Sequence, residues 1–374
     1  DERDQRLFVE DGSRILIFDI DPRRLTNYPD ATLVIGQPDF NSREQGLGPD
    51  RLTRAHGIAL DSEEQRLFVS DQGNNRILVF DVHPNRLRND PRAIAVLGQP
   101  DFFTNAARFI GARARPEARY GLRSITPGGL DYDSLHKRLF VSQLPDNRIL
   151  VFEAAPDKLQ DNLEAFAVVG QPDFSTFDPV ISQTQFAFPK DPSVDSEKQM
   201  LYVSEGFPGG NRIMAFDIRP EVLRSGLAAI DVIGHVDDDG RDDFDRRMAN
   251  DRLDGRTTTL ARAVALDSRH HRLWVADEYN NRVLGFQLDR DNRVFDREAR
   301  WVFGQPDFRT ARADRSVKGM NVPLAVAYDD VDERLYVGDG WNDRVLIYDV
   351  DPERLLSGGN HSAEIVLGQP DFEV

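Results

Sequence analysis

Cysteine is absent from the 374 residues, which excludes disulfides, thiolate metal sites and a cysteine nucleophile. No uninterrupted apolar run reaches the ~20 residues that a membrane-spanning helix needs. Positive charge is scarce: the chain has 47 Lys and Arg against 64 Asp and Glu, so its formal net charge is −17. A field of that sign repels phosphate backbones and disfavours nucleic acid as a partner. Hydrophobic residues make up 40% of the chain, which is enough for a folded core.

One motif occurs six times along the chain. Its copies begin at residues 6, 66, 138, 200, 272 and 334, so the steps are 60, 72, 62, 72 and 62 residues. The second copy reads RLFVSDQGNNRILVFDV and the sixth reads RLYVGDGWNDRVLIYDV. Self-similarity at such a period is the sequence signature of a repeat architecture, which therefore has to be settled before any other feature.

Each copy reads as a hairpin of two short strands joined by a turn rich in Gly and Asn. Both strands are apolar on consecutive residues, which indicates that both faces of the sheet are covered. A shorter strand precedes the hairpin (GIALD, residues 57–61) and another follows it (IAVLG, residues 94–98), with counterparts around most of the other copies. The fold class is therefore all-β: a six-bladed β-propeller of four-stranded antiparallel blades.

The GIALD, RLFVSDQGNNRILVFD and VLGQPDF segments resemble NHL repeats, a family of six-bladed propellers, in the bacterial form whose outer strand ends in GQPDF. The resemblance extends over residues 6–372. It implies the propeller fold and leaves the activity open.

Residues 1–374 are predicted to form a single NHL-type propeller domain. Nothing before residue 6 matches GIALD, so the first blade lacks its innermost strand within this chain. We expect residues upstream of Asp1 to supply it in the natural protein; filling of the gap by another segment is the alternative. The predicted blade cores lie near residues 6–40, 57–102, 129–174, 191–234, 263–308 and 325–372.

Two recurring features are interpreted as scaffold. Five copies end in GQPDF, whose proline lacks the N–H that would extend a ladder and so belongs at a sheet edge. An arginine opens the third strand of every copy, and an aspartate lies a few residues before it in four of them. We expect bidentate pairs between these residues to lock neighbouring blades. The arginines are Arg14, Arg76, Arg148, Arg212, Arg282 and Arg344.

Two insertions distinguish the longer copies, and long loops on a rigid scaffold are where binding surfaces are usually built. The first is basic and aromatic and is predicted to bind a protein partner, through Arg108, Phe109, Arg113, Arg115, Arg119 and Tyr120. The second is acidic, and part of it resembles a calcium loop through Asp237, Asp239 and Asp243. A solvated acidic turn is the alternative interpretation of the second insertion, because no downstream Glu completes the loop.

The residues that begin the innermost strands are predicted to surround one mouth of the central channel. They are His56, Gly128, Lys190, Arg262 and Leu324, and three of the five are cationic or titratable in an otherwise acidic protein. Asp191 follows Lys190 directly, and Asp131 interrupts the strand after Gly128. We expect His56, Asp131, Lys190, Asp191 and Arg262 to form a site for a small carboxylate or phosphate ligand; pairing of each residue with a neighbouring acid is the alternative.

Three function classes are compatible with such a propeller, and the sequence favours a non-enzymatic binding or scaffold module over an enzyme. The resemblance also implies a metal-dependent hydrolase or lyase with calcium or zinc in the channel, but only His56 of the seven histidines falls at a matching position. RNA binding, known for NHL domains, conflicts with the net charge. No catalytic residue is predicted, calcium is the one cofactor considered, and an exported or cell-envelope bacterial setting is expected.

Overall fold

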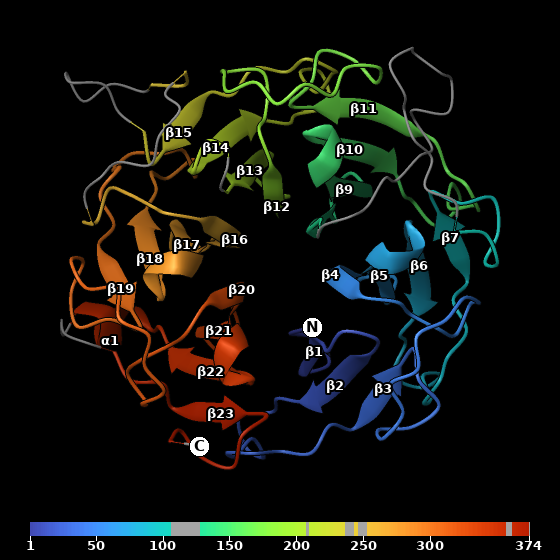
Figure 1. Cartoon of the computed structure of the whole chain (residues 1–374), viewed down its shortest axis with the longest axis horizontal. Coiled ribbons are helices and arrows are strands. Elements are labelled where there is room, and N and C mark those ends of the chain that lie inside the picture. Colours follow the sequence, from blue (N-terminus) through green and yellow to red (C-terminus); the bar gives the residue numbers. More distant parts are fainter. Residues whose placement is uncertain (106–127, 207–208, 236–242, 246–252, 357–360, 374) are drawn as a thin grey trace.

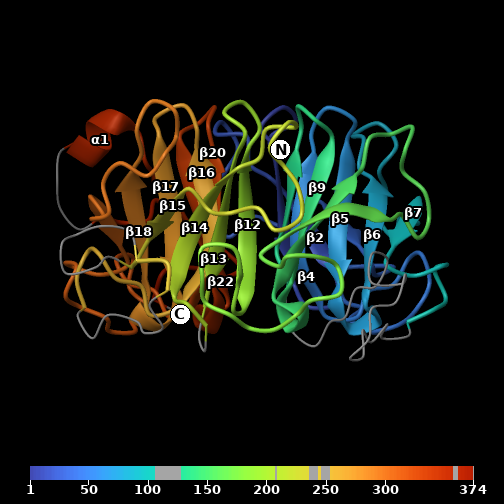
Figure 2. The same cartoon turned by 90° about the horizontal axis from the view of Figure 1, so that it is seen from above.

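The structure is a computed structural model that describes residues 1–105, 128–206, 209–235, 243–245, 253–356 and 361–373. Six antiparallel sheets follow one another around a ring, five of four strands and one of three. Figure 1 looks down the ring and Figure 2 shows it from the side. The predicted six-bladed propeller is confirmed, and so is the first blade of three strands. No helix among the described residues is long and apolar enough to cross a membrane.

The strands run outward from the channel in chain order within each blade. The first three blades comprise β1 (Arg6–Glu10), β2 (Ile15–Asp19) and β3 (Leu33–Ile35); β4 (Ala55–Asp61), β5 (Arg66–Asp71), β6 (Arg76–Asp81) and β7 (Ala95–Leu97); β8 (Leu130–Asp133), β9 (Arg138–Gln143), β10 (Arg148–Glu153) and β11 (Ala165–Val169). The last three comprise β12 (Pro189–Asp195), β13 (Met200–Glu205), β14 (Arg212–Asp217) and β15 (Asp231–Ile233); β16 (Ala261–Asp267), β17 (Arg272–Asp277), β18 (Arg282–Gln287) and β19 (Trp301–Phe303); β20 (Pro323–Asp329), β21 (Arg334–Asp339), β22 (Arg344–Asp349) and β23 (Ile365–Leu367). A short helix, α1 (Pro352–Leu356), precedes β23.

A tight turn joins the second and third strands of each blade. In four blades it is a single 3₁₀ turn followed by a residue in the left-handed region, such as Asn75 with a φ of 54° and Asn281 with a φ of 51°. Asn tolerates this conformation better than most residues, which explains the NN and DN pairs of the repeat. These turns lie at the end of the blade where the inner strands begin.

The hydrophobic core lies between blades, because each sheet packs both faces against its neighbours. Among the described residues, five of the six blade interfaces bury between 13 and 16 apolar residues each, including Phe68, Phe140 and Trp274. The sixth interface, between the last blade and the first, buries only six. The consecutive apolar residues of the hairpins are therefore explained by burial on both sides.

The predicted arginine pairs are present, but the expected lock between neighbouring blades is wrong. Arg76 Nε donates to Asp71 Oδ2 of its own blade at 2.7 Å, because the two residues face each other across the hairpin. Its Nη2 group donates to the carbonyl oxygens of Gly48 and Arg51, and Nη1 donates to that of Phe102 in the GQPDF segment. The third-strand arginines therefore hold the connecting loops in place.

A second set of arginines, at the start of the second strands, links the blades. Arg138 donates through Nε and Nη2 to Asp133 Oδ2 at 2.9 and 2.5 Å, and through Nη1 to the carbonyl oxygen of Ile218 in the next blade at 2.9 Å. Arg272 makes the equivalent contacts with Asp267 and with the carbonyl oxygen of Val350. These pairs lie at the end of the channel opposite the starts of the inner strands.

Candidate functional site at the channel mouth

The inner strands β4, β12, β16 and β20 all begin at the same end of the ring, which we call the channel mouth. Near each start the pairing with the second strand is irregular; in β4 the shift falls between Ala55 and Ile58. An irregularity of this kind bends the strand and redirects its side chains. It places the second residue of each strand on the channel, so that His56, Lys190 and Arg262 converge from three different blades on one cavity.

His56 and Arg262 are in direct contact across the mouth. The distance from Arg262 Nη2 to His56 Nε2 is 2.8 Å. Burial, together with the charges of Arg262 and Lys190, lowers the pKa of His56 to about 3, so the imidazole is neutral at physiological pH. A neutral ring that accepts from a guanidinium at Nε2 must carry its proton on Nδ1. Nδ1 is buried and has no hydrogen-bond partner among the described residues.

Lys190 is the second cation of the mouth. Burial and the neighbouring charge of Arg262 lower its pKa to about 8, so the ammonium form still predominates at neutral pH. Glu278, at the start of the turn 278–280 in the fifth blade, lies 4.0 Å from Arg262 Nη1 through Oε2. Burial raises the pKa of Glu278, while Arg262 and Lys190 oppose that shift. Glu278 is therefore the described carboxylate in closest contact with Arg262, while Glu10 and Asp191 act on the same guanidinium from farther away.

Glu278 is a mouth residue that the sequence analysis missed. The residues at the same position in the other described 3₁₀ turns are Gln72, Leu144 and Gly340, so this turn alone of the four carries a charge there. A comparison of turn residues between copies would have found it. The structure also places Glu10, at the end of β1, on the same cavity, where burial raises the pKa of its carboxyl group to about 7.

Asp131 and Asp191 line the same cavity, but both carboxylates bind the protein itself. Asp131 Oδ2 accepts the backbone N–H of Val194 in the next inner strand at 2.6 Å, and Asp191 Oδ2 accepts that of Val264 at 3.1 Å. Burial raises the pKa of each carboxyl group to about 7, although these hydrogen bonds act in the opposite direction. Through these hydrogen bonds the two aspartates link the third blade to the fourth and the fourth blade to the fifth.

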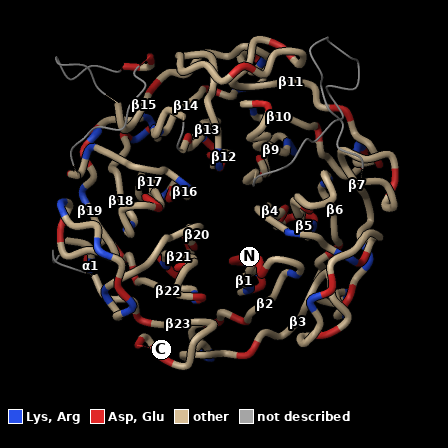
Figure 3. Tube along the Cα trace, in the orientation of Figure 1, with Lys and Arg blue, Asp and Glu red and all other residues tan. Residues whose placement is uncertain are grey.

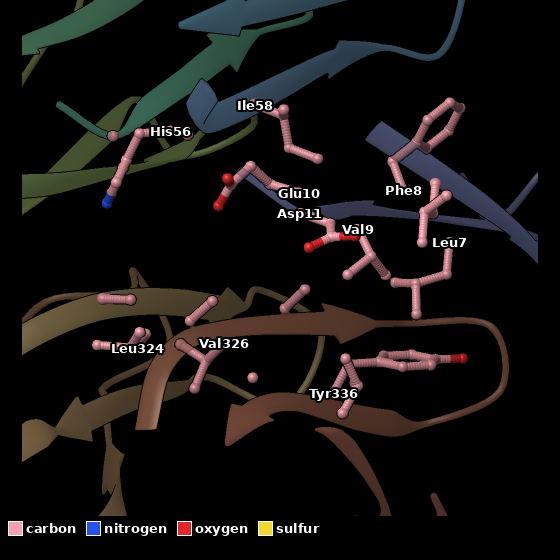
Figure 4. A pocket seen from close by; sticks show the side chains of 18 of the residues that line it. Leu7, Phe8, Val9, Glu10, Asp11, His56, Ile58, Leu324, Val326 and Tyr336 are labelled. Atoms are coloured by element: carbon pink, nitrogen blue, oxygen red, sulfur yellow. The ribbon is translucent and has the colours of Figure 1, made fainter. Parts of the chain in front are cut away.

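The cavity that contains these residues has a volume of about 2080 Å³. It continues from the mouth along β1 and β20, and Figure 4 shows Glu10 directed into the open space between them. Leu324, the fifth predicted mouth residue, lies on the same space and is 36% exposed. Charged segments of both signs occur around the whole ring in Figure 3, so the mouth is distinguished by its arrangement of charges and not by their number.

The donor set of the mouth does not suit a metal ion. Its imidazole and carboxylates stand beside the cations Lys190 and Arg262, and Asp131 and Asp191 already accept backbone N–H groups, whereas zinc or calcium sites gather several neutral or anionic ligands. Among the described residues, one group of three carboxylates could hold a cation, namely Glu2, Asp329 and Asp330 at the opposite end of β20. Asp243 is also described, and its Oδ1 accepts the N–H of Asp245.

The remaining predicted site residues lie outside the described part of the chain. They are the six partner-binding residues Arg108, Phe109, Arg113, Arg115, Arg119 and Tyr120, and the calcium-loop residues Asp237 and Asp239. Their roles stay predictions.

Comparisons with known proteins identify the fold. No family model matches the chain, and no curated protein matches it. Among solved structures, 1118 chains match. A protein from Lactobacillus plantarum is 14% identical with a TM-score of 0.52, over 97% of this chain and 84% of that one. The β-propeller domain of Cps50 (Swd1) from Myceliophteria thermophila is 10% identical with a TM-score of 0.51, over 99% and 85% of the two chains. At these identities the similarity is one of fold, and membership of the NHL family stays a prediction.

Proposed function

We propose that this protein is a non-enzymatic binding module whose channel mouth holds a small anionic ligand. The observation that carries the proposal is the convergence of Lys190 and Arg262, from two blades, on a cavity where no described carboxylate lies closer to Arg262 than 4.0 Å. Buried cations are normally paired with carboxylates, because an uncompensated buried charge is costly. An anion from solution would complete this balance.

The expected ligand carries a carboxylate or a phosphate group. Arg262 offers a planar guanidinium that is already oriented by His56, and such a fork suits two oxygens of one anionic group. Lys190 offers a compact positive charge beside it. Binding sites of this type often combine shifted pKa values with a well-formed cavity, and both are present here.

The proposal extends to the setting of the protein. The repeated GIALD and GQPDF segments support an NHL-type propeller of bacterial origin, and the absence of cysteine is compatible with an exported or cell-envelope location. A rigid ring with loops on its mouth face also supports a protein partner or a larger assembly, since propellers commonly present binding surfaces in this way.

Calorimetric titration with inorganic phosphate and with citrate at pH 7 tests the proposal. We expect one site per chain, with the affinity reduced about tenfold or more in Lys190→Met and Arg262→Gln, because a charged hydrogen bond contributes about 1.5–3 kcal/mol. Lys198→Met is the matched control, since Lys198 is exposed at the opposite end of the same blade. Equal affinities in all four proteins, or no binding of either anion, would overturn the proposal.

A further inference from the structure

One connecting loop on the mouth face, residues 309–322, is basic in an otherwise acidic protein. It joins β19 to β20 and carries four cations and one acid, whereas residues 41–54 carry three cations and two acids, and residues 175–188 carry a single acid. These are the three connections from an outer strand to the next inner strand that the structure describes throughout. The four cations are exposed, and none of them forms an ion pair with a described residue: Arg309, Arg312, Arg315 and Lys318.

The acids closest in sequence to these cations are bound to the loop itself. Asp314 accepts the N–H and the hydroxyl group of Ser316, each at 3.0 Å. Asp307, just before the loop, accepts the N–H of Arg309 and the hydroxyl group of Thr310, each at 2.8 Å. Even with both acids counted, the cations outnumber them by four to two, so the loop presents a net positive charge to solvent.

The loop is held between the 3₁₀ turns of the fifth and sixth blades. Asn281, directly after the turn of the fifth blade, donates through Nδ2 to the carbonyl oxygen of Ala311 at 3.0 Å. In the turn of the sixth blade, Asn342 Nδ2 donates to the carbonyl oxygen of Asp314 at 3.1 Å. Because the backbone is fixed on both sides, a partner loses less conformational entropy in ordering this surface than it would on a free loop.

The same two turns carry exposed aromatic residues. Tyr279 and Trp341 occupy equivalent positions and are 56% and 68% exposed, whereas the second and third blades have Gly73 and Pro145 at this position. The backbone N–H of Trp341 donates to the carbonyl oxygen of Asn321 at the end of the loop, at 3.1 Å. Aromatic residues and arginine are the types most enriched where proteins bind one another.

We propose that the loop 309–318, together with Tyr279 and Trp341, binds an acidic peptide segment of a protein partner, with apolar side chains among its carboxylates. The inference rests on the protein-partner part of the proposed function, but it does not use Lys190 or Arg262. The cations of the loop attract the carboxylates, and the two rings pack against the apolar side chains. A nucleic acid is disfavoured, because its charges continue over the surrounding acidic surface, whereas a peptide confines its carboxylates to the loop.

The probe is a fluorescein-labelled pool of blocked eight-residue peptides, each with five Glu and three Tyr in random order. It is titrated with the 374-residue chain and followed by fluorescence anisotropy. We expect saturable binding that weakens with added salt, because exposed charges are screened. Arg312→Glu combined with Arg315→Glu should reduce the affinity about tenfold or more. Lys198→Glu combined with Arg290→Glu makes the same change of charge at exposed positions of the opposite end and should keep the wild-type affinity.

A second variant tests the aromatic part of the surface. Tyr279→Ser combined with Trp341→Ser changes two exposed side chains, so the fold should be retained. We expect its affinity for the tyrosine pool to fall about tenfold, to the level of a pool in which Ser replaces Tyr. The wild-type chain and this variant should bind the serine pool equally. Equal binding of both pools by the wild-type chain would contradict the role of the two rings.

Lys190→Met separates this surface from the anion site. It should weaken phosphate binding and leave peptide binding unchanged; a loss of peptide binding as large as in the loop variant would place the peptide at the channel mouth and overturn the inference. It is also overturned if the wild-type chain does not bind the tyrosine pool, if the control variant loses as much affinity as the loop variant, or if heparin or oligothymidylate binds more tightly than the peptides. A failure to bind phosphate and citrate would overturn the anion site alone.

Discussion

The two ends of the channel use the same charged residue types in opposite ways. At the end away from the mouth, Arg138 and Arg272 each lie 2.5 Å from the aspartate that ends the inner strand of the same blade, and each also donates to a carbonyl oxygen of the next blade. At the mouth, Arg262 is 4.0 Å from its nearest carboxylate, and it contacts a neutral histidine at 2.8 Å instead.

The difference separates structural charges from available ones. A buried ion pair that is closed by hydrogen bonds has no capacity left for a ligand, and removing one partner exposes the full cost of burying the other. A cation without a close carboxylate keeps donors free. We therefore expect mutations at the far end to affect stability and mutations at the mouth to affect binding.

The largest effect is expected for Arg138→Met. This change leaves the buried Asp133 without its cation and removes the link to Ile218 in the next blade. We expect the free energy of unfolding in urea to fall by about 3–5 kcal/mol. Arg262→Met, measured in the same way, should change it by about 1 kcal/mol or less. Similar losses in both variants would break the distinction between the two ends.

A second prediction concerns the packing beneath the mouth. A Cβ atom at Gly129 would lie 1.8 Å from Asp191 Oδ1 and 2.9 Å from Asp191 Cα, so Gly129→Ala must displace the neighbouring inner strand. We expect a loss of stability of about 1–3 kcal/mol. Gly46→Ala is the control, because the nearest atom to its added Cβ would be 3.4 Å away. If Gly129→Ala left the free energy of unfolding unchanged, the close packing of Asp191 against Gly129 would be contradicted.

A third prediction uses the raised pKa values of Asp131 and Asp191, both about 7. In the unfolded chain an aspartate titrates near 3.9, so between these values the folded state holds more protons and stability falls as the pH rises. Asp131→Asn keeps the acceptor for Val194 and removes the titration. The free energy of unfolding in urea should therefore fall less between pH 4 and pH 8 in this variant than in the wild-type chain. We expect the two decreases to differ by about 1 kcal/mol or more. An unchanged pH profile would contradict the assigned burial.

The smallest predicted effect is the pH dependence of anion binding. Because the pKa of Lys190 is about 8, its positive charge is present at pH 7 and mostly lost at pH 9.5. Phosphate affinity should weaken about tenfold over this range in the wild-type chain, once the ionisation of phosphate is accounted for. Lys190→Met should reduce that dependence to the part that comes from Glu10, whose pKa of about 7 adds a negative charge to the same cavity over this range. A wild-type affinity that stays constant would show that Lys190 does not contact the anion.

Much of the fold could be predicted from the sequence because each copy encodes the same local structure. Consecutive apolar residues in the strands indicated that both faces of each sheet are buried, and the NN and DN pairs indicated turns with a residue in the left-handed region. Together with the six copies, these features predicted the number of blades and the order of their strands. The role of the third-strand arginines could not be predicted in full, because their other partners are loop carbonyl oxygens such as Gly48 O. Because every residue has a backbone carbonyl group, the sequence does not indicate which one an arginine contacts.

The mouth was predicted in part for a similar reason. The register of the repeat placed His56, Lys190 and Arg262 at one level of the ring. It could not show that Asp131 and Asp191 reach across to the N–H groups of Val194 and Val264, since that depends on the spacing between blades. Glu278 was missed because its position is defined only by comparison between turns.

The most direct test of the anion site is a crystal structure of the chain with selenate, whose selenium atom scatters anomalously. The account predicts an anomalous peak between Lys190 and the guanidinium of Arg262, and no such peak in Lys190→Met crystals under the same conditions. An empty mouth in the wild-type chain at saturating selenate would contradict it.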